Sequence, residues 1–251
     1  MRRAVLLRIV PCPLVLLCLS ALSCPPASVA SPSGHRIFHD DFSGEPEQKW
    51  HFFARPGPRI NARHGNPAPA LDTGAAGEKN GLLSKRVFHL SPGMVVRCDL
   101  FISGRSGSVC FGGSFGFPRN PDAFLQGVWP DWLVGMSYDY LGHLGWTGGI
   151  IPEGGTLTCC LVDEDGDLEI SRRPYRDHYL GGWHTYEILV TDSGFVEFRI
   201  DGDLVYYSRK RLTYGRSHLP LLLGHHSGRT GTVYHDNLEV LTYSDVNELE
   251  K

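Results

Sequence analysis

The chain has 251 residues, 41% of them hydrophobic and 20% charged, and 27 aspartates and glutamates outnumber its 24 lysines and arginines. The formal net charge of −3 argues against a general nucleic-acid binder, which would need a basic face. The 30 glycines and 17 prolines favour turns over long helices, and the length suits one all-β sandwich better than two domains.

Residues 1–30 have the features of a cleavable signal peptide. Two basic residues, Arg2 and Arg3, precede an apolar stretch that runs to Leu22, and Ser28-Val29-Ala30 supplies small residues where a signal peptidase would cut. Prolines and one arginine interrupt the stretch, which leaves too little apolar length for a comfortable membrane span. We therefore expect a secreted, periplasmic or cell-surface protein.

The mature domain is expected at residues 31–251. Removal of the leader takes three arginines and no acidic residue, which makes the net charge −6. No second apolar span follows in the sequence, so we expect no membrane insertion once the leader is removed. Two alternatives stay open: an uncleaved membrane anchor, and lipid anchoring at Cys24, which follows Ala21-Leu22-Ser23 in a loose likeness to a lipoprotein box.

Four cysteines remain in the mature chain: Cys98, Cys110, Cys159 and Cys160. They allow three complete disulfide pairings, and export would permit disulfides. Cys159 and Cys160 are adjacent, so on a strand they point to opposite faces and are not expected to bond to each other. The spacing of the four does not suggest zinc. We expect small buried side chains with at most one bridge.

Short strands separated by turns are predicted along the mature chain, and no apolar period of 3.6 residues persists for three turns. Residues 54–80 are dense in Pro, Gly, Ala and Asn, which predicts a long surface loop with one short strand. Other strands are expected at residues 37–42, 82–90, 93–103, 109–117, 132–147, 157–162, 168–170, 221–224 and 232–243. This pattern favours an all-β sandwich.

Residues 183–208 are the clearest predicted element, three antiparallel strands joined by two tight turns. Asp192-Ser193-Gly194 and Asp201-Gly202 place glycine where a hairpin turn requires a positive φ. The second turn would pair Phe198 with Val205. The two registers send one set of side chains to a single buried face: Tyr186, Ile188, Val190, Val196, Phe198, Ile200, Val205 and Tyr207. The opposite face would pair Glu187 with Arg199 across the strands.

Four motifs resemble those of one superfamily. They are His39-Asp40-Asp41-Phe42-Ser43-Gly44 with Trp50 nearby, Gly182-Trp183-His184-Thr185-Tyr186, Phe198-Arg199-Ile200-Asp201-Gly202 and Tyr234-His235-Asp236-Asn237-Leu238-Glu239-Val240. Their order and spacing are similar to the pattern of the concanavalin A-like lectin/glucanase superfamily, particularly laminin-G-like domains of secreted bacterial proteins. Residues 54–180 match no motif of that superfamily.

The resemblance implies a fold but no single activity. The expected fold class is all-β, a two-sheet antiparallel jelly-roll sandwich preceded by a cleavable signal peptide. One sheet would be concave and able to bind sugar, and the first and last strands would lie side by side. Lectins, hydrolases, lyases and interaction domains share this fold.

Asp40, Asp41 and Asp236 are the candidate metal ligands, with Asn237 beside them. If the first and last strands are neighbours, these carboxylates approach one another, and Ca²⁺ takes about six to eight oxygen ligands. The resemblance supports a structural calcium between these strands. The alternative is that the acids bond to loop backbone or face solvent.

An aromatic segment supplies the candidate carbohydrate-binding residues. Sugar rings present apolar C–H faces that stack on aromatic planes, while nearby Asp or His side chains bond to hydroxyl groups. Alternation would put Tyr138 and Tyr140 on one face with Asp139 opposite. The candidates are Trp129, Trp132, Tyr138, Asp139, Tyr140, His143 and Trp146. The alternative is that most of them are ordinary core and loop residues.

Two further groups are weaker candidates for catalysis. One is an alternating acidic run, in which Gly166 and a turn-like sequence favour a solvated acidic turn over a catalytic pair: Asp163, Asp165, Asp167 and Glu169. The other is a supply of arginine, tyrosine and histidine at residues 172–178 and 225–235. Polysaccharide lyase chemistry uses these residue types, but the superfamily's lyase motifs are absent.

The sequence therefore predicts a secreted, noncatalytic carbohydrate-binding domain whose partner is a polysaccharide or another glycan. Two alternatives remain open. One is a glycan-degrading enzyme on the same scaffold, either a glycoside hydrolase or a polysaccharide lyase. The other is a protein-interaction domain.

Overall fold

The computed structural model describes residues 34–52, 58–73, 80–102, 110–126, 132–140, 156–174, 179, 181–214, 218–225 and 233–243. All of them belong to one compact unit, Ser33–Lys251. The expected leader, residues 1–30, lies outside these ranges, so the signal peptide stays a prediction. None of the helices within the ranges is long and apolar enough to cross a membrane.

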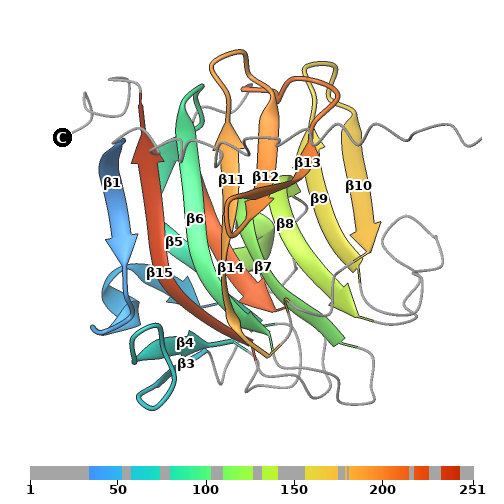
Figure 1. Ribbon diagram of the computed structural model, residues 1–251. Coiled ribbons are helices and arrows are strands. Elements are labelled where there is room, and N and C mark those ends of the chain that lie inside the picture. The colour runs from blue at the N-terminus through green and yellow to red at the C-terminus, as the bar shows by residue number, and fades with distance from the viewer. Residues whose placement is uncertain are drawn as a thin grey trace, which may run out of the picture. The chain divides into compact units, whose positions relative to one another are not determined.

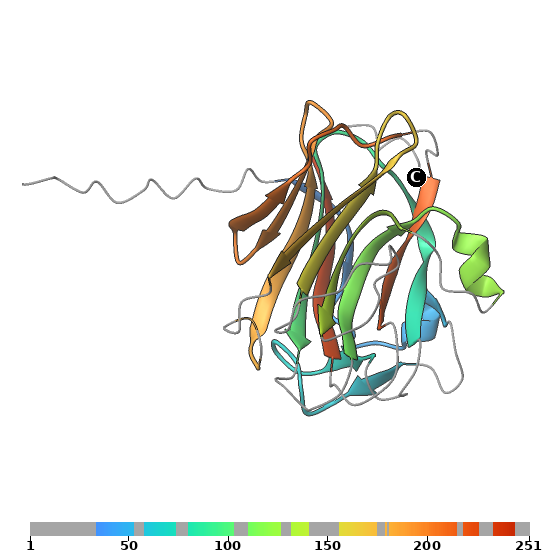
Figure 2. The same ribbon diagram turned by 90° about the vertical axis from the view of Figure 1, so that its right-hand side faces the viewer.

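Two antiparallel sheets face each other and form a sandwich (Figures 1 and 2). Sheet A has eight strands, of which seven follow one another in the order β13 (Asp203–Tyr207), β12 (Val196–Ile200), β11 (Trp183–Val190), β6 (Met94–Ile102), β15 (Val233–Thr242), β4 (Ala70–Asp72) and β3 (Arg59–Asn61). The eighth strand, β1 (His35–Asp40), also pairs with β15.

Sheet B has seven strands, in the order β10 (Leu168–Pro174), β9 (Thr156–Val162), β8 (Trp132–Tyr140), β7 (Cys110–Pro118), β14 (His218–His225), β5 (Asn80–His89) and β2 (Trp50–Phe52). Two short helical elements lie outside the sheets, η1 (Pro46–Gln48) and α1 (Pro121–Leu125). The predicted all-β jelly-roll sandwich is confirmed, and so is the pairing of the first strand with the last. The segment 54–80, predicted to hold one short strand, contributes both β3 and β4.

The core lies between the two sheets and is filled by alternate residues of the strands. In β6, for example, Val96 and Cys98 are buried in the core while Arg97 between them points away from it. In β9, Cys159 is part of the core and its neighbour Cys160 is buried outside it. Cys98, Cys159 and Cys160 are buried, as expected for small core residues, and burial raises the pKa of the Cys98 thiol.

The strongest sequence prediction, the unit at residues 183–208, forms β11, β12 and β13. The two turns are as expected: Gly194 has a φ of 85°, and Asp201 and Gly202 have φ values of 53° and 83°. The first hairpin has the predicted register, with Ile188 opposite Phe198. The local turn chemistry was therefore sufficient to place β11 against β12.

The predicted register of the second hairpin holds next to the turn, where Ile200 lies opposite Asp203, and is wrong by one residue beyond it. A bulge shifts the pairing between Phe198 and Arg199, so that Phe198 lies opposite Tyr206 and not Val205. As a result Tyr206 is 6% exposed and packs in the core, whereas Tyr207 is 43% exposed. The turn residues predicted where the chain reverses but not the bulge that follows.

The predicted cross-strand pair of Glu187 and Arg199 has the right register but different ionic partners. Glu187 lies between Arg199 on β12 and Arg97 on β6. Its carboxylate bonds to Arg97 at 3.0 Å, and Arg199 bonds to Glu197 two residues earlier on its own strand. The strand on the other side of β11, which the turns alone could not identify, supplied the nearer cation.

Candidate functional site

The outer face of sheet B carries an aromatic side chain laid over glycine. Val134 and Met136 of β8 are buried in the core, so Gly135 between them faces outward. A Cβ atom at Gly135 would lie 2.7, 2.8 and 3.1 Å from three indole atoms of Trp132. The indole therefore occupies the space above Gly135, which only a residue without a side chain leaves open.

Trp132 rests on an apolar row that crosses four strands. Leu222 of β14 lies opposite Leu83 of β5 on one side and Gly116 of β7 on the other, and Gly116 lies opposite Gly135. Leu83 and Leu222 are buried together under Trp132, separately from the main core. Trp132 itself is only partly buried. We call these five residues the outer tryptophan row.

A row of small residues lies next to the outer tryptophan row. Thr158 of β9 is opposite Ser137 of β8, Ser137 is opposite Ser114 of β7, and Ser114 is opposite Gly224 of β14. The Ser114 hydroxyl donates to the Gly224 carbonyl at 3.2 Å. Of this row, Ser114 is buried and Thr158 is partly exposed.

The other aromatic candidates divide into two groups. The backbone of β8 includes Tyr138, Asp139 and Tyr140, and it pairs Tyr138 with the core residue Leu157, but the structure does not describe these three side chains. The remaining three candidates lie outside the described residues: Trp129, His143 and Trp146. Trp132 is thus the predicted binding residue whose surroundings are known.

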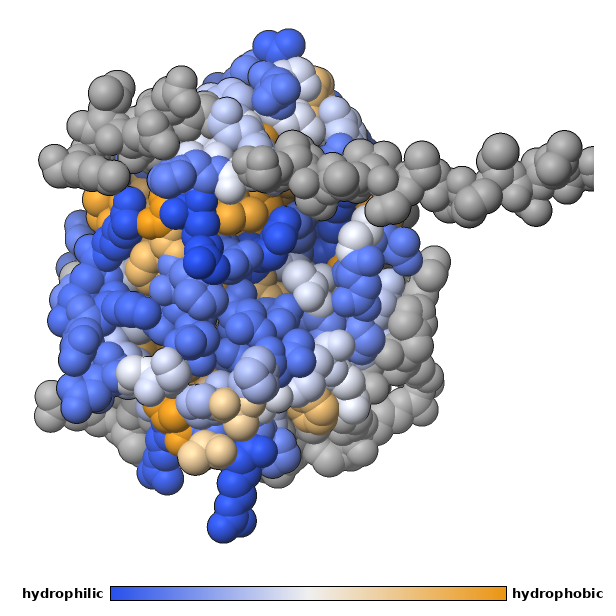
Figure 3. Space-filling model, turned by 60° about the vertical axis from the view of Figure 1, so that its left-hand side comes forward, coloured by the Kyte–Doolittle hydropathy of each residue, from blue (hydrophilic) through white to orange (hydrophobic). Residues whose placement is uncertain are grey.

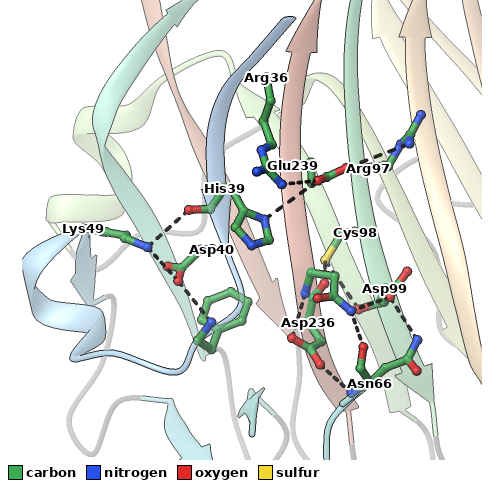
Figure 4. Close-up of polar contacts among 12 residues, drawn as sticks. Arg36, His39, Asp40, Lys49, Asn66, Arg97, Cys98, Asp99, Asp236 and Glu239 are labelled. Atoms are coloured by element: carbon green, nitrogen blue, oxygen red, sulfur yellow. Dashed lines mark hydrogen bonds and ion pairs between the residues drawn. The ribbon is translucent and has the colours of Figure 1, made fainter. Parts of the chain in front are cut away.

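The candidate calcium ligands lie near the first and last strands but serve different partners (Figure 4). The buried Asp40 accepts hydrogen bonds from the Lys49 ammonium at 3.0 Å and from Trp50 Nε1 at 2.6 Å. Asp41 is exposed and accepts from the backbone N–H and hydroxyl of Ser43, which lower its pKa. Both carboxylates are therefore bound to groups of their own segment.

Asp236 faces a different partner, the loop between β3 and β4. Its carboxylate accepts from the backbone N–H of Asn66 at 2.5 Å and of Asn237 at 2.7 Å. On the neighbouring strand, Asp99 accepts from the side-chain amides of Asn66 and Asn237 at 3.0 and 2.9 Å, and from the Thr185 hydroxyl at 2.6 Å. We call Asp99, Asp236, Asn66, Asn237 and Thr185 the loop anchor, because they fasten the loop to sheet A.

The loop anchor contains two buried carboxylates side by side. Burial raises the pKa of Asp236, and the nearby charge of Asp99 raises it further. In the part of the chain that the structure describes, no three Asp, Glu, His or Cys side chains come together in a way that could hold a metal ion. Asp40, Asp41 and Asp236 each accept hydrogen bonds from a different set of donors, and a calcium site at these residues stays a prediction.

The acidic run between β9 and β10 forms a turn held by one lysine. The Lys210 ammonium lies 2.6 Å from Asp163, 3.3 Å from Asp165 and 4.0 Å from Asp167. The Lys210 hydrogen bond lowers the pKa of Asp163. Glu169 accepts hydrogen bonds from the Tyr206 hydroxyl and from the backbone N–H of Arg209 and Lys210. Glu169 thereby links the edge strand β10 of sheet B to the edge strand β13 of sheet A.

Sequence reasoning missed an aromatic group on the outer face of sheet A. Trp183, Phe101 and Tyr234 occupy neighbouring strands, with ring centroids 5.7 and 5.8 Å apart. His64 of the β3–β4 loop stacks on Tyr234 at 4.9 Å. These residues come from four distant parts of the chain, so no sequence spacing could have revealed them. The group supports the loop that the loop anchor fastens.

Comparisons with known proteins identify the fold. No family model and no curated protein matches the chain. Among solved structures, the globular domain of T. cruzi calreticulin is similar with a TM-score of 0.57 and 10% identity, over 85% of this chain and 91% of that one. A Bacteroides ovatus GH16 protein of a mixed-linkage glucan locus, solved with its product G4G4G3G, has a TM-score of 0.56 and 13% identity, over 82% and 100%.

A third similar structure is the carbohydrate recognition domain of Emp47p, with a TM-score of 0.52 and 15% identity, over 83% of this chain and 94% of that one. The chain spans about half, 49%, of the receptor-binding domain of botulinum neurotoxin type G, which it also resembles. Identities this low show shared architecture and nothing finer. The chain has the fold of the concanavalin A-like lectin/glucanase superfamily.

Proposed function

We propose that this protein is a secreted carbohydrate-binding domain that holds a glycan on the outer face of sheet B without cleaving it. The observation that carries the proposal is Trp132, whose side chain lies over Gly135 and which is only partly buried. An indole offers a flat apolar surface to the C–H face of a sugar, and such stacking accounts for much of the affinity at aromatic sites. Leu83 and Leu222 hold the indole from beneath.

In the neighbouring row of small residues, Ser114 is buried and bonded to Gly224, so the hydroxyl group proposed to meet the glycan is that of Thr158. Thr158 is partly exposed beside the outer tryptophan row. Two proteins of the same fold support a glycan as the ligand: the Bacteroides ovatus protein was solved with an oligosaccharide product, and the Emp47p domain is named for carbohydrate recognition. Both similarities are at the level of the fold.

The acids of sheet B support binding without catalysis. A glycosidase needs two carboxyl groups about 5 to 9.5 Å apart at the scissile bond. The seven strands of sheet B contain two acidic residues, Asp139 on β8 and Glu169 on β10. Glu169 is already bonded to Tyr206, Arg209 and Lys210. The strands alone therefore do not supply a catalytic pair.

A glycan array followed by titration of the best ligand tests the proposal. Trp132→Ala should weaken binding at least about tenfold, which corresponds to about 1.4 kcal/mol of lost stacking. Trp183→Ala is the matched control, because Trp183 is a partly buried tryptophan on the outer face of sheet A. If no polysaccharide binds, or if both variants bind as the unmodified protein does, the proposal is wrong.

Glycan cleavage is the second candidate function, favoured by the similarity to the Bacteroides ovatus GH16 structure. Incubation with a panel of polysaccharides separates the two candidates. New reducing ends would indicate a hydrolase, and absorbance of an unsaturated uronate would indicate a lyase. Binding with neither signal is the result expected here.

A further inference from the structure

Two histidines form a cross-strand pair near one end of sheet B. His89 is the last residue of β5 and His218 is the first residue of β14, and the two lie directly opposite each other in the antiparallel register. Their ring centroids are 5.5 Å apart, with the ring planes tilted by 51°. We propose that this pair binds a late first-row transition-metal ion, with Cu²⁺ bound more tightly than Zn²⁺.

The pair lies on the solvent side of the sheet. Phe88 and Leu219, the neighbours of the two histidines, are buried in the main core and lie opposite each other. Because side chains alternate along a strand, His89 and His218 both point away from the core. The exposure of the two residues agrees with this placement, since His218 is exposed and His89 is partly buried. An ion can therefore reach both rings from solvent.

The distance between the rings suits chelation of one ion. With metal–nitrogen bonds of about 2.0–2.1 Å and a tetrahedral or square arrangement, two imidazoles on one ion have centroids roughly 4.5–5.2 Å apart. The observed 5.5 Å is close to that range, and rotation of the exposed His218 ring can supply the difference. The backbone ladder between β5 and β14 holds the two Cα atoms in place, so little chain entropy is lost when an ion binds.

The chemistry of the donors selects the ion. Imidazole nitrogen binds Cu²⁺, Ni²⁺ and Zn²⁺ well, and affinity along the series peaks at Cu²⁺. No group of three His, Cys, Asp or Glu ligands is found among the described residues, so these residues supply two ligands, and water would complete the coordination. An ion at this position would join the end of β5 to the start of β14 as a clamp.

Copper titration of the full chain at neutral pH tests the site. We expect the electron paramagnetic resonance spectrum of one bound Cu²⁺ to show two equivalent nitrogen ligands. We also expect the unfolding temperature to rise by about 3 °C at a tenfold excess over the dissociation constant, reversed by a chelator. Zn²⁺ should give a smaller shift at the same concentration.

Two single variants and one control decide the assignment. His89→Asn and His218→Asn should each weaken the tightest Cu²⁺ site at least tenfold and remove the two-nitrogen signal. His64→Asn is the control, because His64 is an exposed histidine that stacks on Tyr234 of sheet A. Unfolding temperatures without metal show whether each variant is folded. If the copper spectrum and affinity persist in either folded pair variant, or fall equally in His64→Asn, the assignment is overturned.

Discussion

The outer faces of the two sheets differ at the β1–β6 side of sheet A and the outer tryptophan row of sheet B. On sheet A, charged residues of neighbouring strands bond to one another: Arg36 to Glu239 at 3.0 Å, and Arg97 to Glu187 at 3.0 Å. Figure 3, which brings the β1 side of the molecule forward, shows a broad hydrophilic surface there. On sheet B, the outer tryptophan row contains no charge, and Trp132 lies over glycine.

The difference indicates where a ligand can gain most. Cross-strand ion pairs on sheet A already satisfy each other, so a ligand would have to displace them. A partly exposed tryptophan on sheet B gains apolar contact when a ligand covers it. A substitution on the outer face of sheet A should therefore lower only the free energy of unfolding. A substitution in the outer tryptophan row of sheet B should lower both the free energy of unfolding and the affinity for the glycan.

Gly116→Ala should have the largest effect. A Cβ atom there would lie 2.3 Å from the Val134 carbonyl oxygen, and the φ of 148° disfavours any side chain. Backbone cannot move aside as a side chain can, so we expect a loss of about 3 kcal/mol in the free energy of unfolding. Urea denaturation measures it. Gly44→Ala, with open space around the new Cβ, is the control, and equal stability of the two variants would contradict the proposed close packing of β7 on β8.

Asp99→Ala should destabilise by about 2 kcal/mol. The change removes the acceptor of the Asn66 amide and of the Thr185 hydroxyl, and one of the two acceptors of the Asn237 amide. Relief of repulsion with Asp236 offsets part of the cost. Urea denaturation is again the measurement, and glycan binding should be unchanged. Asp203→Ala, an exposed acid on the edge strand β13, should lose less than about 0.5 kcal/mol. A loss of glycan binding in Asp99→Ala would break the separation between the two faces.

Gly135→Ala should destabilise by about 1 kcal/mol, because the new Cβ meets the Trp132 side chain, which can move. Displacement of the indole should change tryptophan fluorescence and weaken glycan binding in the same variant. Gly44→Ala again serves as the control for both readouts. Full binding together with an altered fluorescence spectrum would separate Trp132 from the binding face.

The smallest expected effect is a difference in pH dependence between the two sheets. Burial raises the pKa of Asp236, so the folded protein binds this proton more tightly than the unfolded chain does. The stability from Asp236 is present below the ordinary value of 3.8 and is lost as pH rises through the folded pKa. Lys210 lowers the pKa of Asp163, so that contribution is present above 3.8 and is lost as pH falls through the folded pKa.

The free energy of unfolding, measured from acid to neutral pH, separates the contribution of Asp236 from that of Asp163. Asp236→Asn should flatten the fall in stability above the ordinary carboxyl pKa, whereas Asp163→Asn should flatten the loss in acid. The slope of stability against pH is the readout, so a constant loss from the substitution itself does not interfere. Two variants with the same profile as the unmodified protein would show that neither shift is coupled to folding.

Predictions from sequence succeeded where a feature depends on neighbours in the chain. The turns at Gly194 and Gly202, and the alternation that buries Ile188 and Phe198, follow from backbone sterics and strand geometry over a few residues. The bulge that exposes Tyr207 depends on how β13 finishes its pairing with β12, which alternation does not encode.

The surroundings of the candidate sites could not be predicted for the same reason. The acidic residues near the terminal strands suggested an ion, because their residue types suit calcium, and that ion stays a prediction. The structure adds the hydrogen-bond partners: Asp236 accepts from Asn66, 170 residues away in the chain, and Asp40 accepts from Lys49 and Trp50. Two carboxylates that lie close together need positive charge or hydrogen-bond donors around them. The amino-acid sequence does not say whether a metal ion or neighbouring amide groups fill that role.

The amino-acid sequence by itself determined the all-β class, the position of the clearest turns and the presence of an aromatic-rich segment. Each of these depends on local propensity and a two-residue period. Only the tertiary structure decided that Trp132 lies over Gly135 beside Leu83 and Leu222, and that Asp99 and Asp236 fasten a loop. Those arrangements depend on which strands are neighbours and on their register, and pairing between distant strands is set by the packing of the whole sandwich.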